Sequence, residues 1–141
     1  MIETYRGVVF PWLCDQQGHL TMSQYMLMFD VASYHLLDHL TRGLDEPATL
    51  SWADVRHEVD YRAEVKVGAL VVVRSLVTRL GGKSITHRHL LQSTDGAVTH
   101  AELQATTVRF DTAVRQGVAI SAALRESAYK SFVTLRPATL N

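Results

Sequence analysis

The sequence has little cysteine, no long hydrophobic run and no excess of charge of either sign. Its only cysteine, Cys14, excludes an intrachain disulfide and a thiolate cluster for zinc, and it favours a reducing compartment. No stretch approaches the roughly 20 apolar residues that cross a bilayer, and no basic N-terminal region precedes an apolar run. We therefore expect a cytoplasmic protein without a membrane segment.

The charge balance also bears on the partners of the chain. Fourteen lysines and arginines balance fourteen aspartates and glutamates, and the basic residues are scattered singly among acidic ones. A nucleic-acid-binding protein usually needs a basic excess to displace phosphate counterions, so we expect no nucleic-acid partner. The length of 141 residues and the hydrophobic fraction of 47% predict one globular domain over residues 1–141.

One segment near the N-terminus has the apolar spacing of a long helix. The helix is predicted to begin at Thr21 or Ser23 and to end at about Leu40, before the stop signal Thr41-Arg42-Gly43. Its stripe consists of Tyr25, Phe29, Ala32, Leu36 and Leu40, and Met22, Met26, Leu27, Met28 and Val31 widen it. Because the first turns are apolar nearly all the way round, we expect this helix to be largely enclosed.

The rest of the chain is rich in strand signals. Strands are predicted over residues 2–12, 52–65, 69–80, 85–93 and 98–110, with turns at 67–68, 81–83 and 94–96 and a short terminal helix at 121–132. Small residues on one face of the last strand, Ala101, Leu103, Ala105 and Thr107, would let a helix lie close. The predicted class is α+β, with an antiparallel sheet of about five strands against one long helix.

Two segments in this order resemble a known family. Residues 11–21, leading to Tyr25, and residues 58–68, followed by 80–84, are similar to the hotdog-fold thioesterases related to 4-hydroxybenzoyl-CoA thioesterase and the plant acyl-carrier-protein thioesterases. The resemblance implies a curved sheet wrapped around one central helix. It also implies protomers paired edge to edge, with acyl-CoA in the dimer interface. We expect a homodimer or a dimer of dimers (homotetramer), and no cofactor or metal.

One position departs from the common family pattern. Thr21 stands where many members carry asparagine after the Gly-His-aliphatic stretch. The form with threonine resembles thioesterases that act on betainyl-CoA and similar short polar acyl groups. The resemblance therefore implies an acyl-CoA thioesterase for a small or medium acyl group, with a betainyl-like substrate as one expectation.

The proposed chemistry depends on Asp15. Thioester hydrolysis needs an activated water or another nucleophile, together with a group that holds the charge of the carbonyl oxygen. The resemblance makes Asp15 the general base or the nucleophile, and the sequence leaves this choice open. The oxyanion would be held by backbone amides at residues 20–23, where the helix begins. The alternative is that Asp15 only bonds backbone amides in a loop.

The neighbours of Asp15 are the other candidates for this site. Gly18 and His19 are predicted to be catalytic, with an ordinary turn glycine and a structural histidine as the alternatives. Residues predicted to bind substrate are Gln17, Thr21, Met22 and Tyr25, although the helical spacing of Tyr25 also suits core packing.

Cationic side chains and histidines further along the chain complete the set. Lys83 and Arg88 are predicted to bind CoA phosphates, with solvated surface cations as the alternative. The pair His87 and His89 shares one strand face and either lines the pocket or lies on a solvated face. His35 and His39 stand four apart, but no third ligand is obvious, so no metal site is predicted.

Two other functions remain open at this stage. An acyl-CoA hydratase or dehydratase of the same fold would use an Asp-His pair to move a proton and water across a double bond. A non-catalytic acyl-CoA-binding module would bind the same ligand without hydrolysing it. Cys14 is not predicted to be a nucleophile, because the neighbouring Asp15 would raise the pKa of its thiol.

Overall fold

The computed structural model describes residues 1–133, and the side chains of residues 1–130. The expected single domain extends to residue 141 and stays a prediction, since residues 134–141 lie outside the described part. The elements are β1 (Ile2–Val8), a short 3-10 helix (Pro11–Leu13), α1 (Met22–Thr41), β2 (Leu50–Tyr61), β3 (Leu70–Leu80), β4 (Ser84–Ser93), β5 (Thr99–Asp111), β6 (Gln116–Gly117) and α2 (Ala122–Val133).

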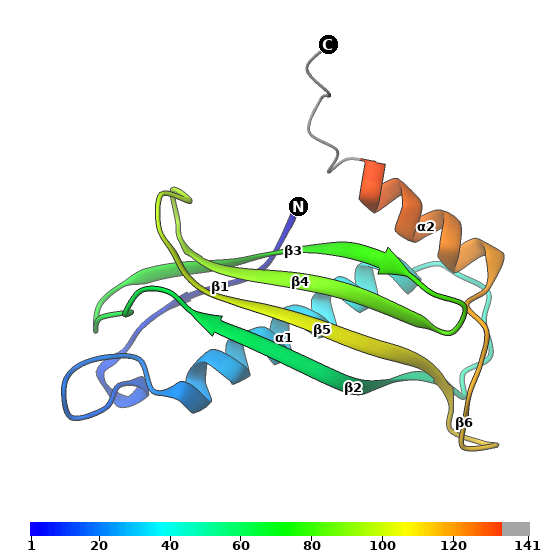
Figure 1. Ribbon diagram of the computed structural model, residues 1–141, viewed down its shortest axis with the longest axis horizontal. Helices are drawn as coiled ribbons and strands as arrows, with labels where there is room; N and C mark the ends of the chain where they lie inside the picture. Colours follow the sequence, from blue (N-terminus) through cyan, green and yellow to red (C-terminus); the bar gives the residue numbers. More distant parts are fainter. Residues whose placement is uncertain (134–141) are drawn as a thin grey trace, which may run out of the picture.

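The strands form one antiparallel sheet with α1 along its inner face (Figure 1). The order is β1-β3-β4-β5-β2, and the two-residue β6 pairs with β5. The consecutive hairpins β3-β4 and β4-β5 follow from the short Gly-containing turns between them. This arrangement confirms the predicted α+β class, and it leaves β1 and β2 as the two edges of the long-strand sheet.

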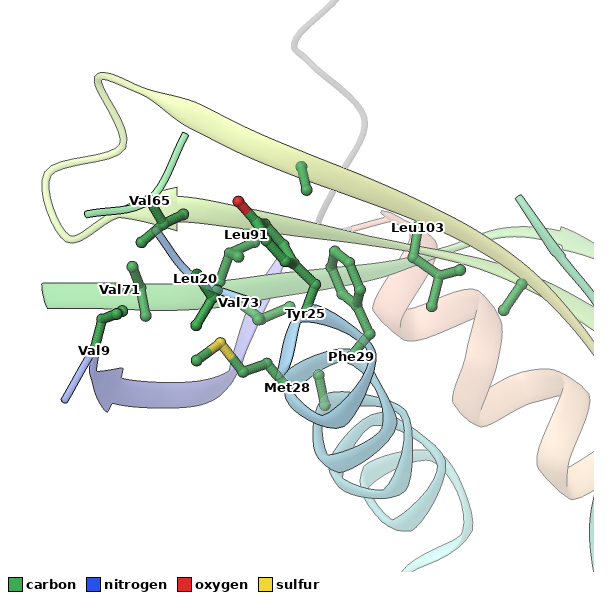
Figure 2. Packing of buried hydrophobic residues seen from close by; sticks show 13 residues of the cluster. Val9, Leu20, Tyr25, Met28, Phe29, Val65, Val71, Val73, Leu91 and Leu103 are labelled. Atoms are coloured by element: carbon green, nitrogen blue, oxygen red, sulfur yellow. The ribbon is translucent and has the colours of Figure 1, made fainter. Parts of the chain in front are cut away.

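The core lies where the apolar stripe of α1 meets the sheet. Figure 2 shows Tyr25, Met28 and Phe29 of α1 facing Val73 and Leu91 of the sheet, and Phe29 is fully buried. The small residues of β5 also face this layer, as predicted: Ala101, Leu103, Ala105 and Thr107 are all buried. A second cluster joins the C-terminal half of α1 to α2.

The expectation that α1 is largely enclosed is wrong for the single chain. Met22, Leu27 and Tyr34 are 67%, 54% and 73% exposed. One curved sheet contacts only one side of a helix, and the described elements do not cover the opposite side. The exposed Tyr34 borders β2, so the open side of α1 lies next to a free sheet edge.

The predicted strand over residues 52–65 also differs from the structure. β2 begins at Leu50 and ends at Tyr61, and the chain after it turns back toward the loop before α1. There the carbonyl of Val65 accepts a hydrogen bond from the amide of Leu20 at 2.8 Å. This return segment brings residues 62–67 next to the Asp15 loop.

Candidate active site

The loop of residues 14–21 connects the 3-10 helix to α1 and is closed by its own backbone. Cys14 and Leu20 form an isolated antiparallel β-bridge through their backbones. Between them, the amide of Asp15 donates a hydrogen bond to the carbonyl of His19 at 2.8 Å. Gly18 has a φ of +75°, a conformation that side-chain-bearing residues rarely adopt, while its surroundings would leave room for a Cβ atom. Its backbone conformation, not crowding, therefore calls for glycine at this position.

The carboxylate of Asp15 is exposed and anchored on one side. Its Oδ1 atom accepts hydrogen bonds from the amides of Gln17 at 2.9 Å and His19 at 3.1 Å. These are the backbone bonds that the structural alternative for Asp15 predicts. They do not exclude chemistry, because a carboxylate fixed through one oxygen presents its other oxygen, Oδ2, in a set direction.

A second carboxylate lies beside this loop. His19 Nε2 is 3.3 Å from Oε2 of the exposed Glu64, a residue that the sequence placed in a strand and not in the site. The rings of Tyr25 and Tyr61 meet edge to face, with their centroids 5.1 Å apart. A cavity of about 250 Å³ is lined by Tyr25, Tyr61, Arg62, Ala63 and Glu64. Burial raises the pKa of the Tyr25 hydroxyl.

The start of α1 offers fewer amides than expected. The amides of Leu20 and Thr21 donate to the carbonyls of Val65 and Leu13, at 2.8 and 3.0 Å. Met22 and Ser23 are the first two helical residues, and a helix supplies no carbonyl one turn earlier for such amides. The predicted oxyanion site over residues 20–23 thus narrows to the amides of Met22 and Ser23.

The structure brings together most of the predicted residues but separates two of them. The loop and the first turn of α1 carry Asp15, Gln17, Gly18, His19, Thr21, Met22 and Tyr25. Lys83 lies in the β3-β4 hairpin, at the far end of a strand that spans about 33 Å at 3.3 Å per residue (Figure 1). Arg88 pairs with Glu102 on the outer sheet face. Within one chain, Lys83 therefore lies far from the Asp15 loop, and Arg88 is held in an ion pair with Glu102, a residue that also binds Arg62.

A larger cavity, of about 320 Å³, lies between α1 and the edge strand β2. Its lining residues are Asp30, Ser33, Tyr34, Leu37, Asp38, Thr41, Ser51, Trp52 and Asp54. The set combines three carboxylates with two aromatic rings. Arg109 lies over the Trp52 ring, 4.7 Å from its centroid, and is itself paired with Glu46.

Both expectations for His87 and His89 are wrong, because the two side chains are fully buried inside the protein, with His89 next to Ser33 of α1. Their burial lowers the pKa of His87 to about 4 and that of His89 to about 3, so both rings are neutral at pH 7. A signal was present in the sequence. Ile85 and Leu91 share the strand face of the two histidines, and a face that begins and ends with large apolar residues points inward.

Within residues 1–133, no group of three or more histidine, cysteine or acidic side chains is placed to hold a metal ion. No helix in the same part of the chain is long and apolar enough to cross a membrane.

The comparison with protein families shows to which family this protein belongs. The profile of the thioesterase-like superfamily matches residues 8–127, which include the Asp15 loop, α1 and the strands β2 to β5, whereas all of β1 except Val8 lies before the matched region. The chain belongs to the thioesterase-like superfamily. The family predicted from the Asp15 loop and the β2 segment is thereby confirmed, and with it the class of enzyme, a thioester hydrolase.

Solved structures agree with the superfamily fold. A Staphylococcus aureus protein in complex with CoA has a TM-score of 0.85 at 12% identity, covering 99% of this chain and 90% of that one. A Thermus thermophilus thioesterase complexed with coenzyme A and Zn has a TM-score of 0.78 at 21% identity, covering 96% of both chains. A 1,4-dihydroxy-2-naphthoyl-CoA thioesterase from Synechocystis reaches 0.73 at 16% identity, covering 89% and 93%.

At these identities the structural likeness shows the fold, and it confirms the predicted hotdog arrangement of a curved antiparallel sheet around one long helix. No curated protein matches the sequence.

Proposed function

We propose that this thioesterase hydrolyses acyl-CoA thioesters and that Asp15 is its catalytic carboxylate. The observation that carries the proposal is the anchoring of Asp15 Oδ1 by two backbone amides, a few residues before the helix amides of Met22 and Ser23. A carboxylate held in this way and an amide pair at a helix start supply the two elements that thioester hydrolysis needs.

The reaction follows from these two elements. Asp15 Oδ2 takes a proton from water, whose oxygen attacks the thioester carbonyl, or it attacks the carbonyl itself and water then cleaves the resulting anhydride. In either case the carbonyl oxygen becomes negatively charged, and the amides of Met22 and Ser23 are placed to stabilise it. Collapse of this oxyanion breaks the carbon-sulfur bond, which in the nucleophilic route happens before water cleaves the anhydride. The proton taken from water passes through Asp15 to the leaving thiolate, so that the free acid and the CoA thiol are released.

Coenzyme A is the expected carrier of the acyl group. The Staphylococcus aureus and Thermus thermophilus proteins of the same fold are described in complex with CoA. Gln17, Thr21, Met22 and Tyr25 lie where they could contact the thioester end of such a substrate. The contacts of Lys83 and Arg88 with CoA phosphates, and the cytoplasmic location, stay predictions.

We also infer that two copies pair along β2, so that each active site uses both chains. β2 has a free edge with the 61% exposed Val55 near its middle, and the open side of α1 lies beside it. Antiparallel pairing about a two-fold axis would reverse the strand direction. The Tyr61 end of one copy, with its Asp15 loop, would then adjoin the Trp52 end of the other. A monomer in light scattering at micromolar concentration would contradict this arrangement.

In that dimer the cavity between α1 and β2 becomes the acyl pocket of the partner's Asp15 loop. Asp38 is paired with Arg42, but the carboxylates of Asp30 and Asp54 favour a positively charged or hydrogen-bond-donating acyl group. The rings of Tyr34 and Trp52 favour a cation with apolar substituents. These features support a short polar acyl group of the betainyl type, as the resemblance of the Thr21 form implies.

The test is release of free thiol from a panel of acyl-CoA thioesters. Asp15→Asn should lower kcat about 10²- to 10⁴-fold, the usual contribution of general acid-base catalysis. Asp111→Asn is the matched control, because Asp111 Oδ1 also accepts a backbone amide two residues ahead, that of Ala113 at 2.8 Å.

Each result of this assay supports or contradicts the proposal. Unchanged turnover in Asp15→Asn would refute the role of Asp15. Binding of acyl-CoA without thiol release by the wild-type protein would identify a binding module instead, and water addition to an enoyl-CoA would identify a hydratase.

A further inference from the structure

A chain of hydrogen bonds crosses the sheet from one edge to the other. It contains Thr4 of β1, Ser75 of β3, His89 and His87 of β4, Thr107 of β5 and Asp54 of β2, one or two residues from each long strand in the order of the sheet. All of its members except Asp54 are buried, and Asp54 lines the 320 Å³ cavity. This chain of hydrogen bonds thus connects the interior of the sheet to that cavity.

The two histidine rings have a polar partner at every ring nitrogen. His87 Nδ1 and His89 Nε2 are 2.7 Å apart, His87 Nε2 is 2.7 Å from Thr107 Oγ1, and His89 Nδ1 is 2.5 Å from Ser75 Oγ. Ser33 of α1 also approaches His89 Nε2, at 3.1 Å. A neutral imidazole has one donor and one acceptor nitrogen, so these contacts restrict which nitrogen carries the proton.

The carboxylate at the end of the chain fixes its direction. Asp54 Oδ1 only accepts, and the Thr107 hydroxyl donates to it at 2.9 Å. Thr107 Oγ1 must then accept from His87 Nε2-H, which leaves His87 Nδ1 to accept from His89 Nε2-H.

The same logic continues to the opposite edge of the sheet. His89 Nδ1 carries no proton and accepts from the Ser75 hydroxyl. Beyond it, the Thr4 hydroxyl lies 2.6 Å from Ser75 Oγ and 3.2 Å from the carbonyl of Val73. From Ser75 onward, every donor points toward Asp54.

We propose that this chain positions Asp54 as a recognition carboxylate of the α1/β2 cavity, for an acyl group with a positive charge or a hydrogen-bond donor. His87, His89 and Thr107 are positioning residues in this arrangement, because they act on the ligand only through Asp54. The inference rests on the proposed function, since it deepens the acyl specificity of the same enzyme.

Two observations favour a functional over a purely structural role. Buried polar groups stabilise a fold less than apolar residues of similar volume, and half-satisfied networks destabilise it, so this position has no need of histidines for packing. The chain also ends at a group that reaches a cavity. Asp54 Oδ1 is held by Thr107, while Oδ2 lies 3.6 Å from Nε2 of the half-exposed His57.

The first test is the protonation of the two rings, measured by long-range ¹H-¹⁵N correlation on ¹⁵N-histidine-labelled protein at pH 7. Both rings should be neutral and carry the proton on Nε2 in the wild-type protein. In Thr107→Val the acceptor at His87 Nε2 is lost. His87 should then protonate on Nδ1, and His89, which does not touch Thr107, should change to Nδ1 as well. The proposed direction of the hydrogen bonds would be refuted by a proton on Nδ1 of either ring in the wild-type protein. It would also be refuted if the proton of His89 stayed on Nε2 in Thr107→Val.

The second test is hydrolysis by matched variants. Thr107→Val and Asp54→Asn should lower kcat/KM for a cationic acyl-CoA such as trimethylglycyl-CoA about tenfold or more, mainly through KM, as expected when a charged hydrogen bond is lost. The isosteric neutral 3,3-dimethylbutyryl-CoA should be affected less than about twofold. Thr107→Ser keeps the hydroxyl and should restore the wild-type values. Thr106→Val is the control, since Thr106 points to the other sheet face toward Thr86.

These outcomes separate the inference from the proposed function. If the wild-type protein releases no thiol from any acyl-CoA, both the proposed function and the recognition role of Asp54 are refuted. The tautomers of His87 and His89 would still show whether the hydrogen bonds all point toward Asp54. If thioesters are hydrolysed but Thr107→Val has the wild-type kcat/KM for both substrates, the thioesterase proposal stands and the role of Asp54 is refuted.

Discussion

The loop that carries Asp15 and the buried chain that ends at Asp54 are built in opposite ways. The Asp15 carboxylate is exposed, and the bonds that hold it join residues at most four positions apart. The chain to Asp54 is buried and joins strands that are distant in the sequence, for example His87 to Thr107 and Thr107 to Asp54. One carboxylate is therefore oriented by local backbone amides, and the other by side chains from across the sheet.

This difference predicts different sensitivities. A loop closed by backbone amides should lose activity when its conformation changes, with little loss of stability. A buried network of neutral histidines should instead link stability to pH, because its protonation is incompatible with the folded state. The predictions below test this contrast from the largest expected effect to the smallest.

The largest effect should be a loss of stability on mild acidification. Burial lowers the pKa of His87 to about 4 and that of His89 to about 3, whereas both rings titrate near 6.5 in the unfolded chain. Their stabilising contribution is fully present above about pH 6.5 and is lost as the pH falls toward the folded-state values. Urea unfolding should show a loss of about 2 kcal/mol per histidine between pH 7 and pH 5.

The pH window and a variant serve as controls for this effect. Most carboxylates, including Glu102, whose pKa is lowered by its bond to Arg88, begin to contribute only below about pH 5. His35→Gln, which removes an exposed histidine of α1, should keep the same pH dependence. A free energy of unfolding that stays constant from pH 7 to pH 5 would contradict the buried neutral pair.

The same contrast explains what the sequence could predict. The α+β class, the long helix and the β3-β4-β5 meander follow from periodicity and glycine-containing turns, which are local signals. The Asp15 loop was recognisable because its residues are contiguous. Its positive φ at Gly18 and its Asp15 backbone bonds are also set within a few residues.

Features that depend on strand register were out of reach. Asp54 lies opposite Thr107, and Ser75 opposite His89, only because β2-β5 and β3-β4 pair in one register. Glu64 was missed for a similar reason, since it reaches His19 only after the chain turns back beyond Tyr61. The open side of α1 depends on how far one sheet wraps a helix, and helical periodicity alone does not specify that.

A change at Gly18 should have an intermediate effect, on the loop alone. Gly18→Ala forces a side chain into a φ of +75° and should cost about 1 kcal/mol of stability or shift the loop. Because His19, the next residue, donates its amide to Asp15 Oδ1, a shift would misdirect the carboxylate. We expect thioesterase kcat to fall about tenfold, measured by thiol release.

Gly82→Ala is the matched control for Gly18→Ala. Gly82 lies in the β3-β4 hairpin, where an added Cβ would meet no atom within 4 Å and φ is not in the left-handed region. It should leave kcat and the unfolding midpoint close to the wild type. Equal activity losses in the two variants would show that the loop conformation is not what orients Asp15.

The smallest effect should come from the partner of His19. Glu64→Gln removes a charge 3.3 Å from His19 Nε2 while keeping an acceptor oxygen, and exposed ion pairs of this kind contribute at most about 1 kcal/mol. We expect kcat/KM to change about two- to threefold and the unfolding midpoint to stay constant. Glu58→Gln, which removes an exposed carboxylate of β2 paired with Arg56, is the control.

A loss of a hundredfold or more in Glu64→Gln alone would instead make Glu64 part of the catalytic machinery. The separation between a locally oriented Asp15 and contributions from distant strands would then no longer hold.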